Sequence, residues 1–490
     1  MATATPSGPA EGHRLQKGIL SLPNCVAISA ALMAPVIAVV LNAPAAAPNA
    51  GAALPLSFLV AFVAIAFVAN SVIQFTRRLP SSGSFYTFCS HGLGSGAGFF
   101  TGWLYFAAFI AFAVGLFTAV GAFARQYLQD EWSTSVPWWV LSLIAIALVF
   151  LLSVRSIKAS VRVDLALLGV EMVVFLVLGI IAVVRAGGGN SAHYFTPGAS
   201  PSHYKGIALG AVFGILSFVG FEAAAVLGTE TRNPRRNIPR AVFAALAIIG
   251  IFYIFEMYAL TAGYHLNNAA QLKAFLSDPT PFPTLAHRYA PWMVQIVEIA
   301  AILGIFSCFL AVQNATVRVI YTMGRDGVLP RSLGRVHRSW HSPYVAIYAL
   351  TALSIALGIG LAAWLGSGIT AVYGWTGSLG TAAVIIVYMM ANVALIRYFW
   401  RDPERSILRH VVAPLIGVAF LAYPLYFVAK PGQAYPYNLV PYLVLFWIVL
   451  GLGAYFYLRS QGPEKLATVG RAVAEEEDEL GEGRLTSAPV

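Results

Sequence analysis

The chain has 490 residues, of which 59% are hydrophobic and only 10% are charged, whereas an average soluble domain is roughly 25% charged. This composition excludes a protein built around a single soluble core. The net charge of +10 does not indicate nucleic-acid binding, because the basic residues lie in short connections between apolar runs, which is a signal of membrane topology. The sequence therefore predicts an all-α membrane protein that is embedded in the lipid bilayer.

Twelve transmembrane helices are predicted from the apolar runs, because a run of about 20 residues can cross a ~30 Å hydrocarbon layer. Pro, Gly and Asn mark most of the connections between the runs. In chain order the predicted spans are approximately residues 20–41, 52–75, 97–126, 137–154, 163–185, 205–229, 240–263, 291–323, 344–365, 371–398, 410–429 and 438–459.

The two ends of the chain and the basic residues predict how the spans are oriented. Residues 1–19 are expected to form an N-terminal tail, of which residues 1–16 are polar and mixed. Residues 461–490 contain AEEEDELGEG and are expected to form a disordered acidic tail. If both ends lie on one side, 24 of the 30 Lys and Arg residues lie on that side. By the positive-inside rule both termini are then cytoplasmic, and the protein is expected in the cell (inner) membrane.

Spans one and six each carry residues that interrupt a helix. Span one has Pro35 in its middle and the tract Asn42-Ala-Pro44 near its outer end, and span six has Gly214 and Gly220 around its centre. Close packing or a simple kink explains either interruption alone. The two spans are equivalent, however, if the first ten spans form two five-span halves. Paired interruptions of this kind indicate a transporter site, where half-helix ends present free N–H and C=O groups to a ligand.

Two carboxylates are predicted at similar depth in the membrane. Glu222 lies ten residues before Arg232, which is roughly 15 Å along a helix, and Glu171 lies nine residues beyond Arg162, about 13–14 Å. An ionisable group at this depth is costly and is a functional candidate by default. Each is either a group that couples protonation or a cation to gating, or a neutral structural glutamate. Glu256 and Glu298 fall nearer the outer ends of their spans, where interfacial solvation is expected.

Other side chains are weaker candidates. Asn314 in span eight either faces the cavity or bridges two helices. Most aromatic residues are expected to form interfacial belts or to pack, and those considered as gates are Phe109, Phe218, Phe221, Tyr373 and Trp375. The scattered cysteines and histidines show no disulfide framework, metal-ligand spacing or catalytic set. We therefore expect no cofactor, no metal and no enzymatic activity.

Three stretches of the sequence resemble one known family. FVGFEAAAVLGTETRNPRRNIPRAV is similar to the sixth-span signature of the amino acid–polyamine–organocation permeases, with its Gly-Phe-Glu and Asn-Pro-x-x-Asn-Ile-Pro elements. RRLPSSGSFYTF followed by GLGSGAGFFTGW is similar to the family's connection between spans two and three, and RVIYTMGRDGVLP to its motif at the end of span eight. The resemblance covers about residues 20–460.

The resemblance implies a five-plus-five inverted-repeat (LeuT-like) fold with two further C-terminal helices. The repeats would cover about residues 20–186 and 205–398, and the extra helices about residues 410–460. The resemblance also implies a substrate held between spans one, three, six, eight and ten. Ser217, Phe218, Val219 and Gly220 would form the unwound part of span six, and Glu222 would match an acidic residue linked to gating or proton sensing in some members.

Two positions depart from the family pattern. Many members carry a Gly-Ser-Gly-like tract in span one that binds the substrate carboxylate through backbone N–H groups, whereas this chain has Ala34-Pro35-Val36-Ile37-Ala38. Proline has no N–H to donate, so an amine-bearing substrate of another kind becomes an alternative. Proton-coupled relatives often place a Lys in span five, where its ammonium group takes the place of a sodium ion. This chain has Glu171 at that position, and a carboxylate cannot mimic a sodium ion, although it could carry a proton or bind a cation.

We therefore expect a secondary active transporter that moves amino acids or related amines by alternating access, through proton-coupled symport or through antiport. A proton or a sodium ion is the expected coupling ion. The alternatives are a transporter of another amine or organic cation, and an ion or solute channel. Glu171 and Glu222 are the expected coupling or gating residues. The expected substrate-binding residues are Met33, Ala34, Pro35, Val36, Ile37, Phe109, Ser217, Phe218, Val219, Gly220, Phe221, Asn314, Tyr373 and Trp375.

Overall fold

The computed structural model describes residues 20–79, 84–155, 157–226, 231–325, 327–337, 340 and 342–460. Both predicted tails, 1–19 and 461–490, lie outside the described residues. Within the described ranges the regular structure is helical, apart from one isolated parallel β-bridge between Leu20 and Thr231. The expectation of an all-α protein is confirmed for this part of the chain.

Ten helical stretches of the described chain are long and apolar enough to cross a membrane. The first, Leu22–Arg78, has 57 residues and contains the first two predicted spans, and a shorter apolar helix, Trp138–Val154, coincides with the fourth. The others are Ser95–Trp132, Ala166–Arg185, His203–Ala225, Pro234–Gly263, Pro291–Arg325, Tyr344–Leu365, Ala371–Tyr398, Leu408–Ala429 and Tyr437–Ser460. The protein is therefore a multi-pass membrane protein.

The first stretch is divided into short helices because it contains several prolines. A proline occupies the first or second position of α1, α2, α3 and α4, where its missing N–H is not needed and its fixed φ suits a helix start. The elements in order are α1 (Leu22–Leu32), α2 (Pro35–Ile37), the π-helix η1 (Ala38–Asn42), α3 (Ala43–Ala50), η2 (Gly51–Ala53) and α4 (Leu54–Arg78).

The rest of the bundle consists mainly of long helices. These are α5 (Ser84–Leu93), α6 (Ser95–Trp132), α7 (Trp138–Arg155), α8 (Ile157–Arg185), α9 (His203–Phe218), α10 (Ala223–Val226), α11 (Pro234–Gly263), α12 (Ala269–Leu276), α13 (Pro281–Tyr289), α14 (Val294–Arg325), α15 (Tyr344–Leu365), α16 (Ala371–Tyr398), α17 (Ala413–Ala429) and α18 (Val440–Ser460). The short turns are η3 (Gly187–Gly189), η4 (Ala192–Phe195), η5 (Pro197–Ala199), η6 (Pro291–Met293), η7 (Arg331–Gly334), η8 (Leu408–Val412) and η9 (Tyr437–Leu439).

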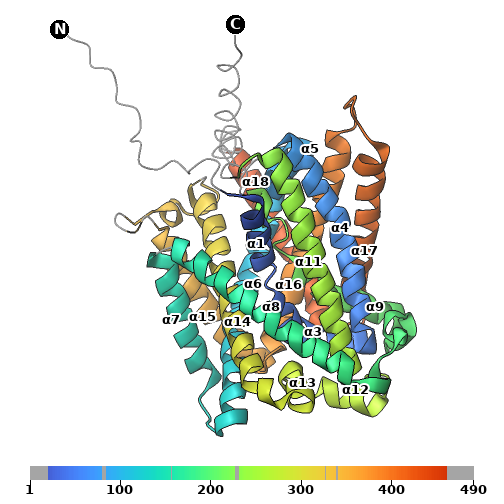
Figure 1. Cartoon of the computed structure of the whole chain (residues 1–490). Coiled ribbons are helices and arrows are strands. Elements are labelled where there is room, and N and C mark those ends of the chain that lie inside the picture. The colour runs from blue at the N-terminus through green and yellow to red at the C-terminus, as the bar shows by residue number, and fades with distance from the viewer. Residues whose placement is uncertain are drawn as a thin grey trace, which may run out of the picture.

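Helix α6 lies in the interior and packs against α5, α7, α14 and α16, while α4 packs against α9, α11 and α17. Figure 1 shows α7 and α15 along one side of the bundle and α4 and α17 along the other. Glycines permit the close approach of helices. A Cβ on Gly115 would lie 2.4 Å from the Thr376 hydroxyl oxygen of α16, and one on Gly214 of α9 would lie 2.6 Å from the Ala61 Cβ of α4.

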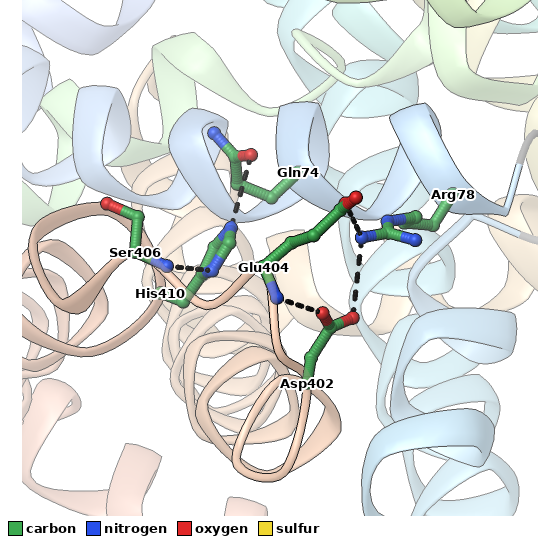
Figure 2. Close-up of polar contacts among 6 residues, drawn as sticks. All are labelled: Gln74, Arg78, Asp402, Glu404, Ser406 and His410. Carbon is green, nitrogen blue, oxygen red and sulfur yellow. Dashed lines mark hydrogen bonds and ion pairs between the residues drawn. The ribbon is translucent and has the colours of Figure 1, made fainter.

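A polar cluster ties the end of α4 to the connection between α16 and α17 (Figure 2). The Arg78 guanidinium pairs with Asp402 at 3.4 Å and also with Glu404. On the neighbouring turn, the His410 ring accepts a hydrogen bond from the Ser406 N–H at 3.0 Å and contacts Gln74 at 3.4 Å. Arg78 thus holds together two segments that are distant in the sequence.

Candidate functional site

The first predicted span is interrupted between α1 and α2. Ala34 adopts the left-handed conformation, with φ 46° and ψ 71°, which costs an L-residue roughly 1–2 kcal/mol. The following Pro35 contributes to the end of α1, because its ring disfavours the right-handed helical region for the residue before it. Further along, Pro44 has no N–H for the turn before it, and the Ala43 N–H bonds to the Ala38 carbonyl in the wider π-helical pattern.

The sixth predicted span is interrupted between α9 and α10. Val219 is extended, with φ −58° and ψ 128°, and Gly220 has a φ of 104°. A Cβ on Gly220 would lie 2.9 Å from the Leu32 carbonyl oxygen and 2.8 Å from the Leu32 Cγ. Glycine is therefore required here both for its backbone conformation and because the end of α1 lies directly against it. The two interruptions touch one another.

Hydrogen bonds join the two interruptions. The Tyr253 hydroxyl on α11 lies 2.8 Å from the Met33 carbonyl oxygen and 2.9 Å from the Ser217 carbonyl oxygen. The Ala224 N–H at the start of α10 donates to the Ser29 hydroxyl of α1 at 2.9 Å. A backbone bond from the Arg232 N–H to the Leu20 carbonyl, 3.0 Å long, adds a further connection. Carbonyls freed by the helix breaks are thus satisfied by another helix, as the interior of a membrane protein requires.

A second polar group lies beyond the breaks and links three elements. The Asn42 amide nitrogen donates to the Ser217 hydroxyl at 2.7 Å, and the Tyr373 hydroxyl of α16 donates to the Asn42 carbonyl oxygen at 2.7 Å. All three side chains are buried. Sequence reasoning included Ser217 and Tyr373 as candidates but treated Asn42 only as part of a helix-breaking tract.

Glu222 lies in the connection between α9 and α10, inside a shell of aromatic side chains. Its carboxyl accepts hydrogen bonds from the Tyr105 hydroxyl at 2.8 Å, from the Gly220 N–H at 3.2 Å and, at 3.5 Å, from the Tyr388 hydroxyl. Phe85 of α5 packs on the rings of Tyr105 and Tyr388, with ring centroids 6.0 Å and 5.1 Å away.

The three donors to the Glu222 carboxyl come from three places. They belong to α6, to α16 and to the break itself. A neutral carboxyl keeps free lone pairs on its oxygens, but its hydrogen bonds are weaker than those of a carboxylate, because hydrogen bonds to a charged group are the stronger ones. A change of charge on Glu222 would therefore act on contacts that link α6, α16 and the sixth-span break.

Glu171 lies on α8 against α14 and close to the first break. A Cβ on Gly304 of α14 would lie 3.2 Å from a Glu171 carboxyl oxygen and 2.7 Å from Val36. Three separate elements, α2, α8 and α14, therefore meet at this glycine. The Glu171 side chain is buried there. The predicted candidates Glu171 and Val36 are therefore neighbours at Gly304.

The expectation of interfacial solvation for Glu256 and Glu298 is wrong. Both side chains are buried inside the protein. Glu256 on α11 lies against Gly179 of α8, and a Cβ on that glycine would lie 2.9 Å and 3.0 Å from the two carboxyl oxygens. Depth along the helix was estimated from the sequence, but the face of the helix that carries each residue was not, and both carboxyls lie on faces covered by neighbouring helices.

The structure distributes the remaining candidates unevenly. Phe218 packs against Phe62 of α4 and Tyr253, with ring centroids 5.9 Å and 5.0 Å away, so it lies between α4 and α11. Trp375 lies apart from the breaks and donates its indole N–H to the Pro436 carbonyl at 3.1 Å.

Two aromatic candidates lie on the Glu222 side, and the others differ in burial. Phe221 packs on Tyr388 and Phe109 packs on Tyr105. Pro35 and Ile37 are buried, whereas Asn314 on α14 is half-buried. Among the described residues no group of three or more His, Cys, Asp or Glu side chains could hold a metal ion.

Three partners of the site were missed from the sequence. Tyr253, Tyr105 and Tyr388 stand among 22 tyrosines, and nothing in their local sequence distinguishes them. A signal was available only indirectly, because a buried break and a buried carboxylate each need hydrogen-bond donors from neighbouring helices.

A comparison with protein families identifies the chain's relatives. The family model "Amino acid permease" matches residues 25–430. The chain belongs to this family. The match includes both helix interruptions, Glu222 and the helices that surround them. As an amino acid permease the protein is a membrane transporter rather than an enzyme, and the resemblance identified from the sequence motifs is confirmed.

Individual relatives of this amino acid permease differ in what they carry. The chain is 27% identical over 442 residues to the branched-chain amino acid permease BcaP of Bacillus subtilis, covering 86% of this chain and 88% of that protein. It is 25% identical to the methylthioribose transporter of the same organism, covering 85% and 88% of the two chains. It is 26% identical to the low-affinity putrescine importer PlaP of Escherichia coli, covering 72% and 75%.

Proposed function

We propose that this amino acid permease is a secondary active transporter that carries an amino acid or a related amine across the cytoplasmic membrane by alternating access. The observation that carries the proposal is the contact between the two helix breaks, where Gly220 lies against Leu32 and Tyr253 bonds to a carbonyl of each. Two broken helices that meet in the interior supply backbone groups for a ligand without exposing them to lipid.

The architecture proposed with this function is a domain of twelve spans over residues 20–460, preceded by a cytoplasmic tail at 1–19. Its first ten spans form two inverted repeats, over about residues 20–186 and 205–398, and two helices follow at about 410–460. Residues 461–490 form a disordered acidic tail. With both termini cytoplasmic, α10 lies on the cytoplasmic side of the break and α9 on the outer side.

The substrate is proposed to carry an amine. In the sixth-span break, the Gly220 N–H bonds to Glu222, and the N–H groups of Val219 and Phe221 bond to preceding carbonyls. Pro35 has no N–H to offer. The Met33 and Ser217 carbonyl oxygens each have a second lone pair beside the one that faces Tyr253. These oxygens suit an ammonium group better than the bonded N–H groups of the sixth-span break suit a carboxylate. Of the three relatives named above, the amino acid permease and the putrescine importer are named for substrates that carry an amine, whereas the methylthioribose transporter is not.

Glu222 and Glu171 are the proposed coupling residues. Protonation of Glu222 would weaken the hydrogen bonds from its donors and so loosen the sixth-span break from α6 and α16, whereas Glu171 would act at the first break through its place beside Val36 and Gly304. Transport is thus proposed to be coupled to the movement of a proton, or else to exchange one substrate for another across the membrane. The substrate passes through the space between the breaks, α6, α14 and α16.

Proteoliposomes test the proposal. Uptake by the wild-type protein, Glu222→Gln and Glu171→Gln is measured with and without a pH gradient, using the amine that most stabilises the purified protein in a thermal-shift screen. Each variant should lose the response to the gradient while retaining counterflow of unlabelled against labelled substrate. Asp130→Asn is the control, because Asp130 is an exposed carboxylate near the end of α6.

The outcomes separate the parts of the proposal. Absence of saturable counterflow in the wild-type protein would favour a channel and overturn the carrier. A normal response to the pH gradient in both Gln variants would overturn the coupling role and leave the carrier intact.

A further inference from the structure

An apolar groove lies on the outside of the bundle, away from the two breaks. It has a volume of about 460 Å³ and is lined by α4, η4, η5, α9 and α17, which is within the range of about 300–1,000 Å³ that small-molecule sites occupy. Its walls include Leu56 and Val60 from α4, Ile207 from α9 and Phe420 from α17. The groove therefore brings together four apolar side chains from three spanning helices.

The groove faces the hydrocarbon of the bilayer. Helix α17, which forms one wall, exposes Leu415, Ile416 and Tyr426 on its outer surface, and Figure 1 shows this helix at the edge of the bundle. Large apolar side chains exposed on a spanning helix indicate lipid contact rather than water. An occupant that enters from this side is therefore a hydrocarbon chain.

One end of the groove is polar. The Tyr423 hydroxyl bonds to the backbone carbonyl of Tyr204 at this end, and the next residue along α9 is the half-buried Lys205. Lys430 follows Tyr423 by seven residues, which is two helical turns along nearly the same face. Its ammonium lies 5.8 Å from the centre of the Tyr426 ring. An interfacial tyrosine pair and two cations at one end of an apolar groove match a lipid headgroup.

Positively charged residues are rare on the side of the membrane where this end of the groove lies. With both termini cytoplasmic, only six of the 30 Lys and Arg residues lie on the outer side. Two of these six lie next to elements that line the groove: Lys205 follows the lining residue Tyr204 on α9, and Lys430 follows the last residue of α17. An apolar groove with two cations next to its lining helices is complementary to a molecule with a hydrocarbon chain and an anionic phosphate.

We propose that the groove binds one phospholipid of the outer leaflet, with an acyl chain along α4, α9 and α17 and its phosphate beside Lys205 and Lys430. The lipid bridges α9, the outer part of the broken sixth span, and α17, which does not contribute to the breaks. The choice of leaflet rests on the proposed orientation with both termini cytoplasmic, whereas the binding itself does not depend on the substrate or on coupling and is tested separately from transport.

Native mass spectrometry of the full-length protein released from detergent tests this site. Wild-type protein should keep one phospholipid adduct under activation that removes the others. Ala419→Trp places an indole in the groove and should lower the adduct fraction by about tenfold or more, because excluding even two methylenes weakens binding by roughly that factor. Val60→Trp fills the groove from the opposite wall and should act in the same way.

Leu357→Trp is the matched control, since Leu357 is exposed on α15 on the other side of the bundle. It should leave the adduct unchanged. Lys205→Gln combined with Lys430→Gln should reduce retention of phosphatidylglycerol more than retention of phosphatidylcholine, and equal retention would overturn the headgroup assignment.

Equal adduct fractions in wild-type protein and in a folded, monodisperse Ala419→Trp or Val60→Trp variant would overturn the site. A chain dimer in the wild-type protein that both Trp variants abolish would also overturn it, because a second copy of the chain would then be the occupant. If one Trp variant fails to fold, the other decides the result.

Discussion

The two helix breaks do the same structural task with different residues. In span six the break depends on Gly220, which has a φ of 104° and no room for a Cβ against Leu32. In span one the break lies at Pro35, whose ring disfavours the right-handed helical region for the preceding Ala34, and Ala34 has a φ of 46°. One break is permitted by a missing side chain, and the other accompanies a proline ring.

The difference shows where each break is constrained. Any other residue at position 220 would be unfavourable for two reasons, because the φ is positive and because a Cβ would collide with Leu32. Ala34 is held in a conformation that an alanine adopts at a cost of about 1–2 kcal/mol, and the surrounding bonds from Tyr253 and Asn42 must offset that cost. The first break should therefore tolerate substitution at its turn residue, whereas the second should not.

The largest effect is expected for Gly220→Ala. A Cβ would lie within 3.0 Å of three Leu32 atoms, two of them backbone, and alanine at this φ is strained by itself. We expect transport to be lost and the melting temperature of the purified protein to fall. Gly360→Ala is the control, because a Cβ there meets nothing within 4 Å. A Gly220→Ala protein with normal transport would show that the contact with Leu32 is not maintained.

The next effect is expected for Tyr253→Phe. The variant keeps the ring but leaves the buried Met33 and Ser217 carbonyls without this donor, which costs about 1–3 kcal/mol. We expect lower thermal stability and slower uptake, because both breaks lose one shared contact. Tyr258→Phe, on the same helix, removes a hydroxyl that bonds the exposed Asn190, and it should have little effect. Equal losses in the two variants would contradict the bridging role.

A smaller effect is expected for Asn42→Ala. The change removes the bonds from Asn42 to Ser217 and from Tyr373 to Asn42, but Ser217 retains a bond to the Phe213 carbonyl. A loss of about 1–2 kcal/mol is expected in chemical unfolding, together with weaker substrate binding. Asn190→Ala removes an amide at an exposed turn and serves for comparison.

The smallest effect, of opposite sign, is expected for Ala34→Gly. Glycine adopts the left-handed region without the alanine's strain, so the folded state should gain up to about 1 kcal/mol. The melting temperature should rise slightly or stay the same. Ala30→Gly, inside α1, should instead lower it, since glycine in a helix interior costs about 1 kcal/mol. A lower melting temperature for Ala34→Gly would mean that its methyl group makes a packing contact worth more than the strain.

The sequence allowed prediction of those features that break a local rule. Pro35 inside an apolar run, Gly220 beside a carboxylate and Glu222 within a span are visible because each is costly without a compensating partner. The partners themselves were not predictable, because Tyr105, Tyr253 and Tyr388 reach the site from helices that are remote in sequence. Glu256 and Glu298 were misjudged for a related reason, since a one-dimensional depth estimate does not determine which face of a helix is buried.

The short parallel bridge between Leu20 and Thr231 has a mechanical consequence. It joins the start of α1 to the segment that follows α10, and the Cys25 thiol lies 3.4 Å from the Thr231 hydroxyl beside it. Because the Ala224 N–H also bonds to Ser29, α1 and α10 are held together and would move as one unit. Ala34 and Gly220, which both have a positive φ, are the residues at which the two helices lose their regular geometry, so this unit would rotate about them.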